Sequence, residues 1–358
     1  MVSKKKISKP KSDTIDLEKL LEQKKATIKV IGLGGAGNNT ATRLCESNIY
    51  GAEIIAANTD AQQLLYTEAN KKILLGKNIS SGLGAGADPV IGGEAAKESK
   101  EEIKASLKGA DMVFITCGLG GGTGTGAAPV VADISKKSGA LTVGIATLPF
   151  TMEGKQRLDN ALEGLEKFEK NVDTLIIIPN DKLLEIVPEV SITTAFKIAD
   201  EILVNAVKGI TELITKPGLV NLDFADIRAV MKDGGLAMIG LGTSDTENRA
   251  IESVERALNN PLLDVDIEGA KGALINVSGG TDITIKECQE IVERVSSTLD
   301  PNAKIIWGAV INKELRDTIK TLIVITGLQS SNFYIKDNSY SQEKKKEVEK
   351  ILGVEVIE

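Results

Sequence analysis

The chain alternates short runs of consecutive apolar residues with longer segments in which apolar and polar residues mix. Continuous apolar runs bounded by turn residues are typical of strands buried on both faces, and strands separated by helices favour a mainly parallel sheet. The pattern therefore predicts an α/β protein with helices on both faces of its sheet. In the first half the predicted strands are residues 27–32, 53–58, 72–75, 112–117, 141–146 and 174–178, with helices running through Cys45, over 92–107 and over 127–138.

A long amphipathic segment occupies the middle of the chain, from residue 195 to residue 215. Its apolar residues recur with the 3.6-residue period of a helix that buries one face. The helix is expected to stop at Lys216-Pro217-Gly218, because proline cannot continue a helix and glycine commonly follows its end. Its length and position suit a connector between two domains. The periodic apolar positions are Ala199, Ile202, Leu203, Ala206, Ile210 and Leu213.

Beyond this helix the sequence predicts a second, smaller α/β unit without a glycine-rich loop of its own. A chain of 358 residues is long enough for two packed units. The strands of the second unit are expected at 237–239, 273–277, 304–307 and 321–325, and its helices near 247–259 and 284–299. The predicted organisation is an N-terminal extension (1–26), a first α/β domain (27–195), a central connecting helix (196–218), a second domain (219–328) and a flexible polar tail (329–358).

Bulk composition narrows the classes of function. Apolar residues make up 42% of the chain and charged residues 26%, which is ordinary for a globular protein, and no apolar run approaches the ~20 residues of a membrane span. The net charge of −7 disfavours a nucleic-acid partner. Because the chain has no histidine, neither histidine acid–base catalysis nor a histidine-ligated metal site is available. Cys45, Cys117 and Cys288 lack metal-ligand spacing and are expected as reduced thiols of a cytoplasmic protein.

The segment 120–126 contains five glycines and two threonines directly after the predicted strand 112–117. A generic turn needs only one or two residues at positive φ, so this composition indicates a loop whose backbone N–H groups converge on an anion. The loop lies between a strand end and a helix start, where unpaired N–H groups and the helix dipole favour phosphate. We therefore predict that it binds phosphate. Its residues are Gly120, Gly121, Gly122, Thr123, Gly124, Thr125 and Gly126.

A second glycine-rich loop follows the first predicted strand. Residues 32–37 match G-x-G-x-x-G, the dinucleotide-binding fingerprint, which alone would suggest an NAD-dependent oxidoreductase. The acidic candidate ligand that should follow ~20 residues later is Asp60, which comes somewhat late, and a second phosphate loop is surplus to a dehydrogenase. Two such loops fit one nucleotide polyphosphate that is held from two sides. The candidate ligands in this first loop are Gly34, Gly35, Ala36, Asn38 and Asn39.

Residues 120–126 resemble the tubulin signature GGGTG(T/S)G, and no Gly-Lys-Ser or Gly-Lys-Thr of a Walker loop follows them. From about residue 29 to residue 328 the chain resembles FtsZ, the tubulin-like GTPase family of prokaryotic cell division. The resemblance implies the tubulin/FtsZ fold, with a Rossmann-like GTP-binding domain joined by the central helix to a GTPase-activating domain. It assigns the α- and β-phosphates of GTP or GDP to the first loop and the remaining phosphate contacts to the signature loop. It also assigns γ-phosphate sensing to residues 82–89, including Ala85 and Gly86, although their composition suits a plain surface loop equally well.

The same resemblance implies a ribose and base site. It places Glu153 at the ribose and Arg157 near ribose and phosphate, although their spacing is also that of a surface i,i+4 ion pair. It places Asn180, at the end of a predicted strand, against guanine. Asp200 would accept hydrogen bonds from the N1–H and the amino group of guanine, a pair of donors that adenine does not offer. Phe196 would stack on the base, or else belong to the core.

Residues 221–228 resemble the family's catalytic loop, which reaches into the nucleotide of the next subunit. The resemblance implies that Asp223 and Asp226 polarise the attacking water beside a Mg²⁺–phosphate, with Asn221 assisting. Phosphoryl transfer depends mainly on positioning and charge stabilisation, so two carboxylates and a metal suffice without histidine. The alternative is that these acidic residues merely favour the first turn of a helix.

The resulting hypothesis is a GTPase that uses Mg²⁺ and assembles head to tail into filaments of the division ring at mid-cell. The alternatives are a tubulin-like paralogue that shapes cells and, less favoured, an NAD-dependent oxidoreductase. The short tail and the absence of histidine resemble archaeal members, whereas bacterial members end in a long linker and a tether-binding peptide. We expect the tail, at residues 348–357, to contact cell-division proteins and a membrane tether.

Overall fold

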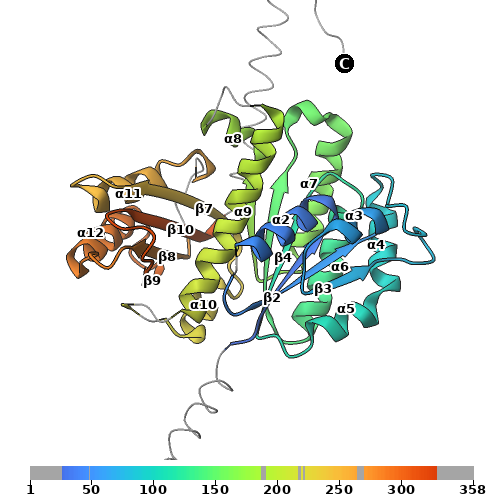
Figure 1. Ribbon diagram of the computed structural model, residues 1–358, viewed down its shortest axis with the longest axis horizontal. Coiled ribbons are helices and arrows are strands. Elements are labelled where there is room, and N and C mark those ends of the chain that lie inside the picture. The colour runs from blue at the N-terminus through green and yellow to red at the C-terminus, as the bar shows by residue number, and fades with distance from the viewer. Residues whose placement is uncertain are drawn as a thin grey trace, which may run out of the picture.

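The computed structural model describes residues 26–47, 49–186, 191–216, 219–220, 222–263 and 270–328 (Figure 1). Within these residues, ten strands form one sheet in the order β3-β2-β1-β4-β5-β6-β7-β10-β8-β9. The first six strands in that order are parallel, which confirms the predicted α/β class. They are β1 (Ile28–Leu33), β2 (Ala52–Asn58), β3 (Lys71–Leu74), β4 (Met112–Gly118), β5 (Leu141–Leu148) and β6 (Thr174–Pro179).

Helices cover both faces of this parallel part (Figure 1). Successive residues of a strand point to opposite faces, so each buried strand contributes to two cores. Val30 lies in the core beneath α2 and α9, and its neighbour Ile31 lies in the core beneath α4, α5, α6 and α7. These helices are α2 (Gly34–Glu46), α4 (Pro89–Glu98), α5 (Lys100–Leu107), α6 (Thr123–Lys137), α7 (Lys155–Glu169) and α9 (Ile192–Thr215), and two shorter ones are α3 (Ala61–Tyr66) and α8 (Asn180–Ile186).

The second α/β unit continues the same sheet. Its first strand, β7 (Gly235–Ser244), pairs in parallel with β6 over three residue pairs and then antiparallel with β10 (Ile319–Leu328). The helix α9 lies between the two units (Figure 1), and Asn276 Nδ2 donates to Gly209 O of that helix at 2.8 Å. The other elements are α10 (Phe224–Met231), α11 (Arg249–Leu258), β8 (Gly272–Gly279), α12 (Ile285–Ser296) and β9 (Lys304–Ile311). The central helix thus packs against a sheet that runs through both units.

Several helix boundaries differ from the predicted ones. The helix α6 begins at Thr123, inside the glycine-rich loop, rather than at residue 127. The reason is tertiary packing: a Cβ added at Gly126 would lie 1.9 Å from Pro89 O, so only a glycine-lined first turn fits against α4. The predicted helix 92–107 is two helices that meet at Ser99. The central helix begins at Ile192 rather than residue 195, because the preceding Ser191 caps it.

The helix α9 runs along the parallel strands, from one end of them to the other (Figure 1). Near its start, Phe196 packs edge to face on Phe150, two residues beyond the carboxyl end of β5. At its end, Thr215 Oγ1 donates to Tyr50 O at 3.1 Å, just before β2 begins. A helix rises 1.5 Å per residue, so these two contacts are roughly 28 Å apart along the axis. The start of α9 therefore lies at the carboxyl ends of the parallel strands, and its end lies at their amino ends. These two ends of the sheet are called its carboxyl edge and its amino edge below.

Of the predicted N-terminal extension (1–26), residues 1–25 lie outside the described residues, and so does the whole predicted C-terminal tail (329–358). Within the described part of the chain, each helix is too short or too polar to cross a bilayer.

Candidate functional site

The two glycine-rich loops meet at the carboxyl ends of neighbouring strands. In the parallel register of β1 and β4, Leu33 lies opposite Cys117, so the two loops leave the sheet side by side. Gly34 has a φ of +67°, and a Cβ added there would lie 2.9 Å from the backbone nitrogen of Gly124. The two loops therefore touch, and only glycine permits both the backbone conformation and the contact.

The first loop is held from beneath by the start of α2. With its amide oxygen and nitrogen assigned from the surrounding hydrogen-bond network, the buried Asn38 amide donates to the carbonyls of Gly32 (3.2 Å) and Gly34 (3.3 Å) and accepts from Asn58 Nδ2 (3.0 Å). Asn38 thus supports the loop from beneath. The other predicted ligands of this loop are more accessible: Gly35 and Ala36 are half-buried and Asn39 is exposed.

The signature loop is built around Gly120, whose φ is +98° and whose added Cβ would lie 2.8 Å from Arg157 O. The hydroxyl of Thr125 is buried and accepts from the Gly120 N–H at 2.9 Å, so this threonine holds the loop from inside. Thr123 Oγ1 lies 2.6 Å from Thr59 Oγ1, at the end of β2. Because α6 begins at Thr123, the N–H groups of its first turn have no partner within the helix and carry its positive dipole end.

The third loop, residues 82–89, lies against the signature loop. A Cβ added at Gly122 would lie 2.8 Å from Ala85 Cβ and 2.8 Å from Asp88 N. Ala87 has a φ of +61°, a left-handed conformation that a non-glycine residue rarely adopts and that is common at ligand-binding loops. Next to it, Gly86 is exposed. The predicted γ-phosphate segment is therefore adjacent to the predicted phosphate loop.

Asp60 joins these loops to β2. Its Oδ1 caps α3 by accepting from Gln63 N at 3.0 Å, and its backbone bridges to Leu83 of the third loop. The carboxylate is half-buried, and its second oxygen adds to the polar groups at this strand end.

Glu153 and Arg157 form the ion pair that their spacing predicts. Glu153 Oε1 also accepts from Phe150 N at 2.9 Å, which fixes the turn between β5 and α7. Arg157 Nη2 lies 4.0 Å from the place that a Cβ on Gly121 would occupy. The ion pair therefore stands beside the signature loop, and the guanidinium adds positive charge there.

Asn180 directly follows β6, the neighbour of β5 in the sheet, and is only 4% exposed. Its Oδ1 has no hydrogen-bond partner among the described residues. A buried amide oxygen without a partner is uncommon in proteins and favours a donor supplied by a ligand. Phe196 is 41% exposed, and its ring centroid lies 5.2 Å from that of Phe150. One part of this ring therefore packs in the protein while another remains open.

Asp200, one turn beyond Phe196, has a side chain that is 13% exposed. Burial raises the pKa of this carboxyl to about 6, since the charged form loses hydration. Arg43 of α2 opposes the rise, because its Nε lies 3.4 Å from Asp200 Oδ2, whereas the neighbouring Glu201 adds to it. Ionising this buried carboxyl therefore costs hydration free energy. Such a cost is common at binding sites, where a ligand can compensate for it.

The acidic pair forms a reciprocal cap at the start of α10. Asp223 Oδ1 accepts from Asp226 N at 2.8 Å, and Asp226 Oδ2 accepts from Asp223 N at 3.3 Å. The predicted helix-start role is therefore present, and each carboxylate retains a second oxygen. The carbonyl of Met231, at the other end of α10, accepts from the hydroxyl of Thr174, the first residue of β6. This helix therefore lies at the amino edge of the strands, away from the loops; Asn221 is outside the described residues.

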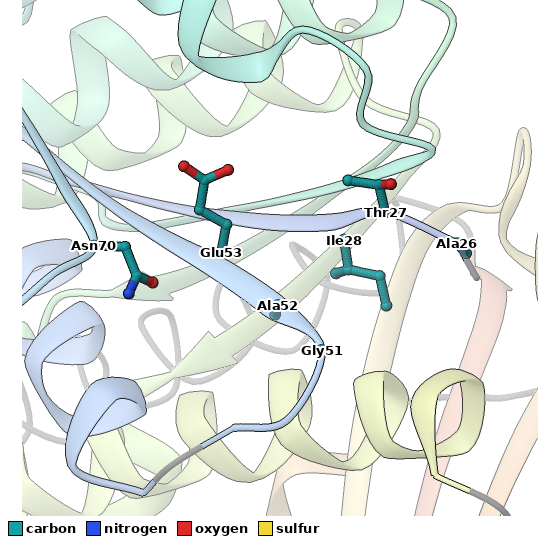
Figure 2. A pocket seen from close by; sticks show the side chains of 7 residues that line it. All are labelled: Ala26, Thr27, Ile28, Gly51, Ala52, Glu53 and Asn70. Atoms are coloured by element: carbon teal, nitrogen blue, oxygen red, sulfur yellow. The ribbon is translucent and has the colours of Figure 1, made fainter. Parts of the chain in front are cut away.

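An open cleft of ≈ 550 Å³ also lies at the amino edge, where β1 and β2 begin (Figure 2). Figure 2 shows Glu53 on β2 with Asn70 beside it. The cleft lies at the far end of these strands from the glycine-rich loops and so is not the predicted nucleotide site. Its lining residues are Ala26, Thr27, Ile28, Gly51, Ala52, Glu53 and Asn70.

A parallel sheet with two touching glycine-rich loops, joined through a central helix to a second α/β unit, defines the class of tubulin-like GTPase folds. A sequence profile of the Tubulin/FtsZ family GTPase domain matches residues 27–188, and one of the FtsZ family C-terminal domain matches residues 235–329. The chain belongs to the FtsZ family, as its motifs predict.

Relatives agree with this assignment. The chain is 64% identical to Cell division protein FtsZ 1 of Methanocaldococcus jannaschii, over 88% of this chain and 86% of that protein. It is also 64% identical to Cell division protein FtsZ 1 of Thermococcus kodakarensis, over 88% of this chain and 84% of that protein. A solved structure described as an empty FtsZ dimer of M. jannaschii matches with a TM-score of 0.86 and 63% identity, over 90% of this chain and 94% of that one.

Sequence patterns did not point to two residues of this region. Arg43 is an ordinary helical arginine until the fold brings α2 against α9. Thr59 follows a strand and becomes notable only because its hydroxyl meets Thr123 of the signature loop. Neither contact is local, so periodicity and spacing carry no signal for them.

Proposed function

We propose that this chain hydrolyses GTP at the junction between subunits of a head-to-tail filament, and that the filament forms the cell-division ring. The observation that carries this proposal is the separation of the two parts of the site. The glycine-rich loops lie at the carboxyl edge of the parallel strands, whereas Asp223 begins a helix at the amino edge. A seven-residue strand such as β4 is itself roughly 20 Å long.

A carboxylate that far away cannot act on the nucleotide of its own subunit. The same carboxylate lies at the end of the molecule that a second copy, stacked in the same orientation, would meet with its loops. Such repeated contacts between unlike surfaces do not close and produce filaments. Exposed apolar side chains around the loops, including Leu83 (88% exposed), Val90 and Met152, form a surface that such a contact would cover.

In this proposal GTP is the substrate, and the chain's residues orient the attack. Asp223 and Asp226 accept hydrogen bonds from a water whose oxygen bonds to the γ-phosphorus. The bond to the β–γ bridging oxygen breaks, leaving GDP and phosphate. Backbone N–H groups of the signature loop and the guanidinium of Arg157 bind the phosphate oxygens. The base is selected by Asp200, which accepts from the guanine N1–H and amino group, and by the buried Asn180 amide.

Mg²⁺ fits this arrangement as a companion of the phosphates. Among the described residues, acidic and cysteine side chains do not gather in threes around a metal-sized space. Mg²⁺ typically keeps several waters and takes only one or two carboxylates beside substrate phosphates, so a dedicated protein cage is not required. When bound, it would neutralise phosphate charge.

The relatives' names favour cell division over a cell-shape paralogue, and the GTPase family domain favours GTP over NAD. We also propose that the protein acts in the cytoplasm, at the mid-cell ring, and that its tail binds a membrane tether.

The test uses Asp223→Asn, because asparagine keeps the helix cap and removes the charge. Phosphate release and light scattering are measured after GTP addition, across a range of protein concentrations. Specific activity of the parent should rise steeply with concentration, since isolated subunits lack the acidic pair. The variant should bind GTP normally as a monomer, polymerise, and hydrolyse GTP about 10²-fold more slowly. Exposed Asp245, replaced by Asn, provides the matched control and should behave as the parent.

Mixing separates the two subunits' roles. Asp223→Asn subunits that carry GTP should regain hydrolysis when co-assembled with subunits that have an intact acidic pair but cannot bind GTP. Hydrolysis independent of protein concentration, or normal turnover by Asp223→Asn, would refute the shared site.

A further inference from the structure

The carboxylate proposed to read guanine is held by a residue from another helix. Arg43 lies in the last turn of α2, and its Nε contacts Asp200 Oδ2 at 3.4 Å. Both side chains are largely buried, with 27% of Arg43 and 13% of Asp200 exposed. The first loop opens the same helix at Gly34, nine residues earlier, so Arg43 is roughly 13 Å along the axis from that loop. Arg43 is therefore placed at the base end of the site.

Asp200 is the kind of group that burial tends to protonate. Loss of hydration raises its pKa to about 6, and Glu201 on the same helix raises it further. Arg43 of α2 is the charge that opposes them. These two are the charged groups that act on Asp200 within the described part of the chain. Without Arg43, a larger share of Asp200 would be protonated at neutral pH.

Protonation would change what Asp200 recognises. An ionised carboxylate presents two acceptor oxygens, which match the N1–H and the 2-amino group of guanine. A protonated carboxyl presents one acceptor and one O–H donor, and that donor would face a donor of guanine. An inosine base has the N1–H but no 2-amino group, so it would lose less.

We propose that Arg43 is a positioning residue for guanine selection: it keeps Asp200 ionised and occupies one side of Oδ2, so that the carboxylate presents both oxygens to the base. The inference rests on the proposed guanine-binding role of Asp200. It predicts that the preference for guanine over hypoxanthine depends on pH, and that the midpoint of this dependence is set by Arg43.

The test compares GDP and IDP binding by isothermal titration between pH 5.5 and 8.0, on nucleotide-free protein. The two ligands share the same phosphates, so phosphate titration cancels in the ratio of their affinities. In the parent, the GDP/IDP ratio should fall as the pH drops through about 6. In Arg43→Gln, which keeps an amide donor but no charge, the midpoint should rise by about one to two pH units. The ratio at pH 7 should then be about two- to tenfold lower than in the parent, and at pH 8.0 within about twofold.

Matched variants distinguish charge from packing. Arg43→Lys restores a positive charge and should return the midpoint toward that of the parent. Arg294→Gln removes an arginine that pairs with Glu255 in the second unit and should leave the midpoint unchanged. Arg43→Met is a second neutral variant, and thermal denaturation without nucleotide confirms that each variant is folded. In an Asp200→Asn background, Arg43→Gln should produce no further pH dependence.

The outcomes separate this inference from the function on which it rests. An Asp200→Asn protein with the parental GDP/IDP ratio would remove Asp200 from the base site, and with it the guanine-selection part of the proposed function, while the shared hydrolysis site is tested separately by Asp223→Asn. If Asp200→Asn lowers the ratio but Arg43→Gln and Arg43→Met keep the parental midpoint, the inference about Arg43 is wrong while the base site stands. Equal weakening of GDP and IDP at every pH would make Arg43 a packing residue only.

Discussion

Two adjacent glycines of the signature loop differ in the space around them, and this difference allows the proposed phosphate binding to be tested separately from the packing of the loop. A Cβ added at Gly121 would have Arg157 Nη2 as its nearest protein atom, at 4.0 Å. A Cβ added at Gly122 would lie 2.8 Å from both Ala85 Cβ and Asp88 N. Ordinary van der Waals contact begins near 3.4 Å, so the protein accommodates alanine at Gly121 but must shift the third loop to accommodate it at Gly122.

For Gly121→Ala we expect the free energy of unfolding without nucleotide to stay the same or rise by up to ~1 kcal/mol, because alanine restricts the unfolded chain. GDP affinity should nevertheless fall at least ~10-fold, equivalent to ~1.4 kcal/mol, since the methyl group takes space that the proposed phosphate site needs. For Gly122→Ala we expect a loss of about 1–3 kcal/mol in stability from overpacking. Its GDP affinity should also fall at least ~10-fold.

Isothermal titration with GDP measures the affinities, and denaturant unfolding of nucleotide-free protein measures the stabilities. The two variants serve as controls for each other, because they differ by one position in the same loop. Parental GDP affinity in Gly121→Ala would show that phosphate does not approach this glycine. Parental stability in Gly122→Ala would contradict the packing of the third loop on the signature loop.

Two further predictions concern stability. Thr125→Val removes the acceptor of the buried Gly120 N–H and should lower the free energy of unfolding by about 1–3 kcal/mol, whereas Thr125→Ser should restore most of that loss. Denaturant unfolding measures both, and a valine variant as stable as the parent would contradict a stabilising role for this hydrogen bond. Asp200 has a pKa of about 6 when folded, above its ordinary 3.8, so its stabilising contribution is complete below about pH 3.8 and is lost as the pH rises through 6. The parent without nucleotide should therefore lose free energy of unfolding between pH 4 and pH 7 that Asp200→Asn does not lose. Allowing for partial exposure of the carboxyl, the difference between the two proteins in this change should be about 2 kcal/mol, and identical pH profiles of unfolding would refute the assignment.

Local features of the sequence determined the elements of the fold and the place of the glycine-rich loops. Continuous apolar runs such as 112–117 predict buried strands because burial on both faces leaves no polar alternation. The glycines at 120–126 predict a loop open to an anion because they remove side chains from the backbone. Both signals are contained in a few consecutive residues. The strand β4 ends one residue beyond its predicted bound, whereas the glycine-rich loop ends four residues early because α6 begins at Thr123.

Tertiary contacts decided what these local signals could not. The helix α6 begins within a glycine-rich loop because that loop packs on α4, and Thr125 holds the loop from inside because its hydroxyl meets Gly120 N. Arg43 becomes a partner of Asp200 only through the packing of α2 against α9. The acidic pair at Asp223 is separated from the glycine-rich loops by the length of the parallel strands. The reason is that α9 runs along these strands, from the level of their carboxyl ends to the level of their amino ends. Residues distant in sequence come together or stay apart according to helix packing and strand direction, and neither is encoded in the spacing of the motifs themselves.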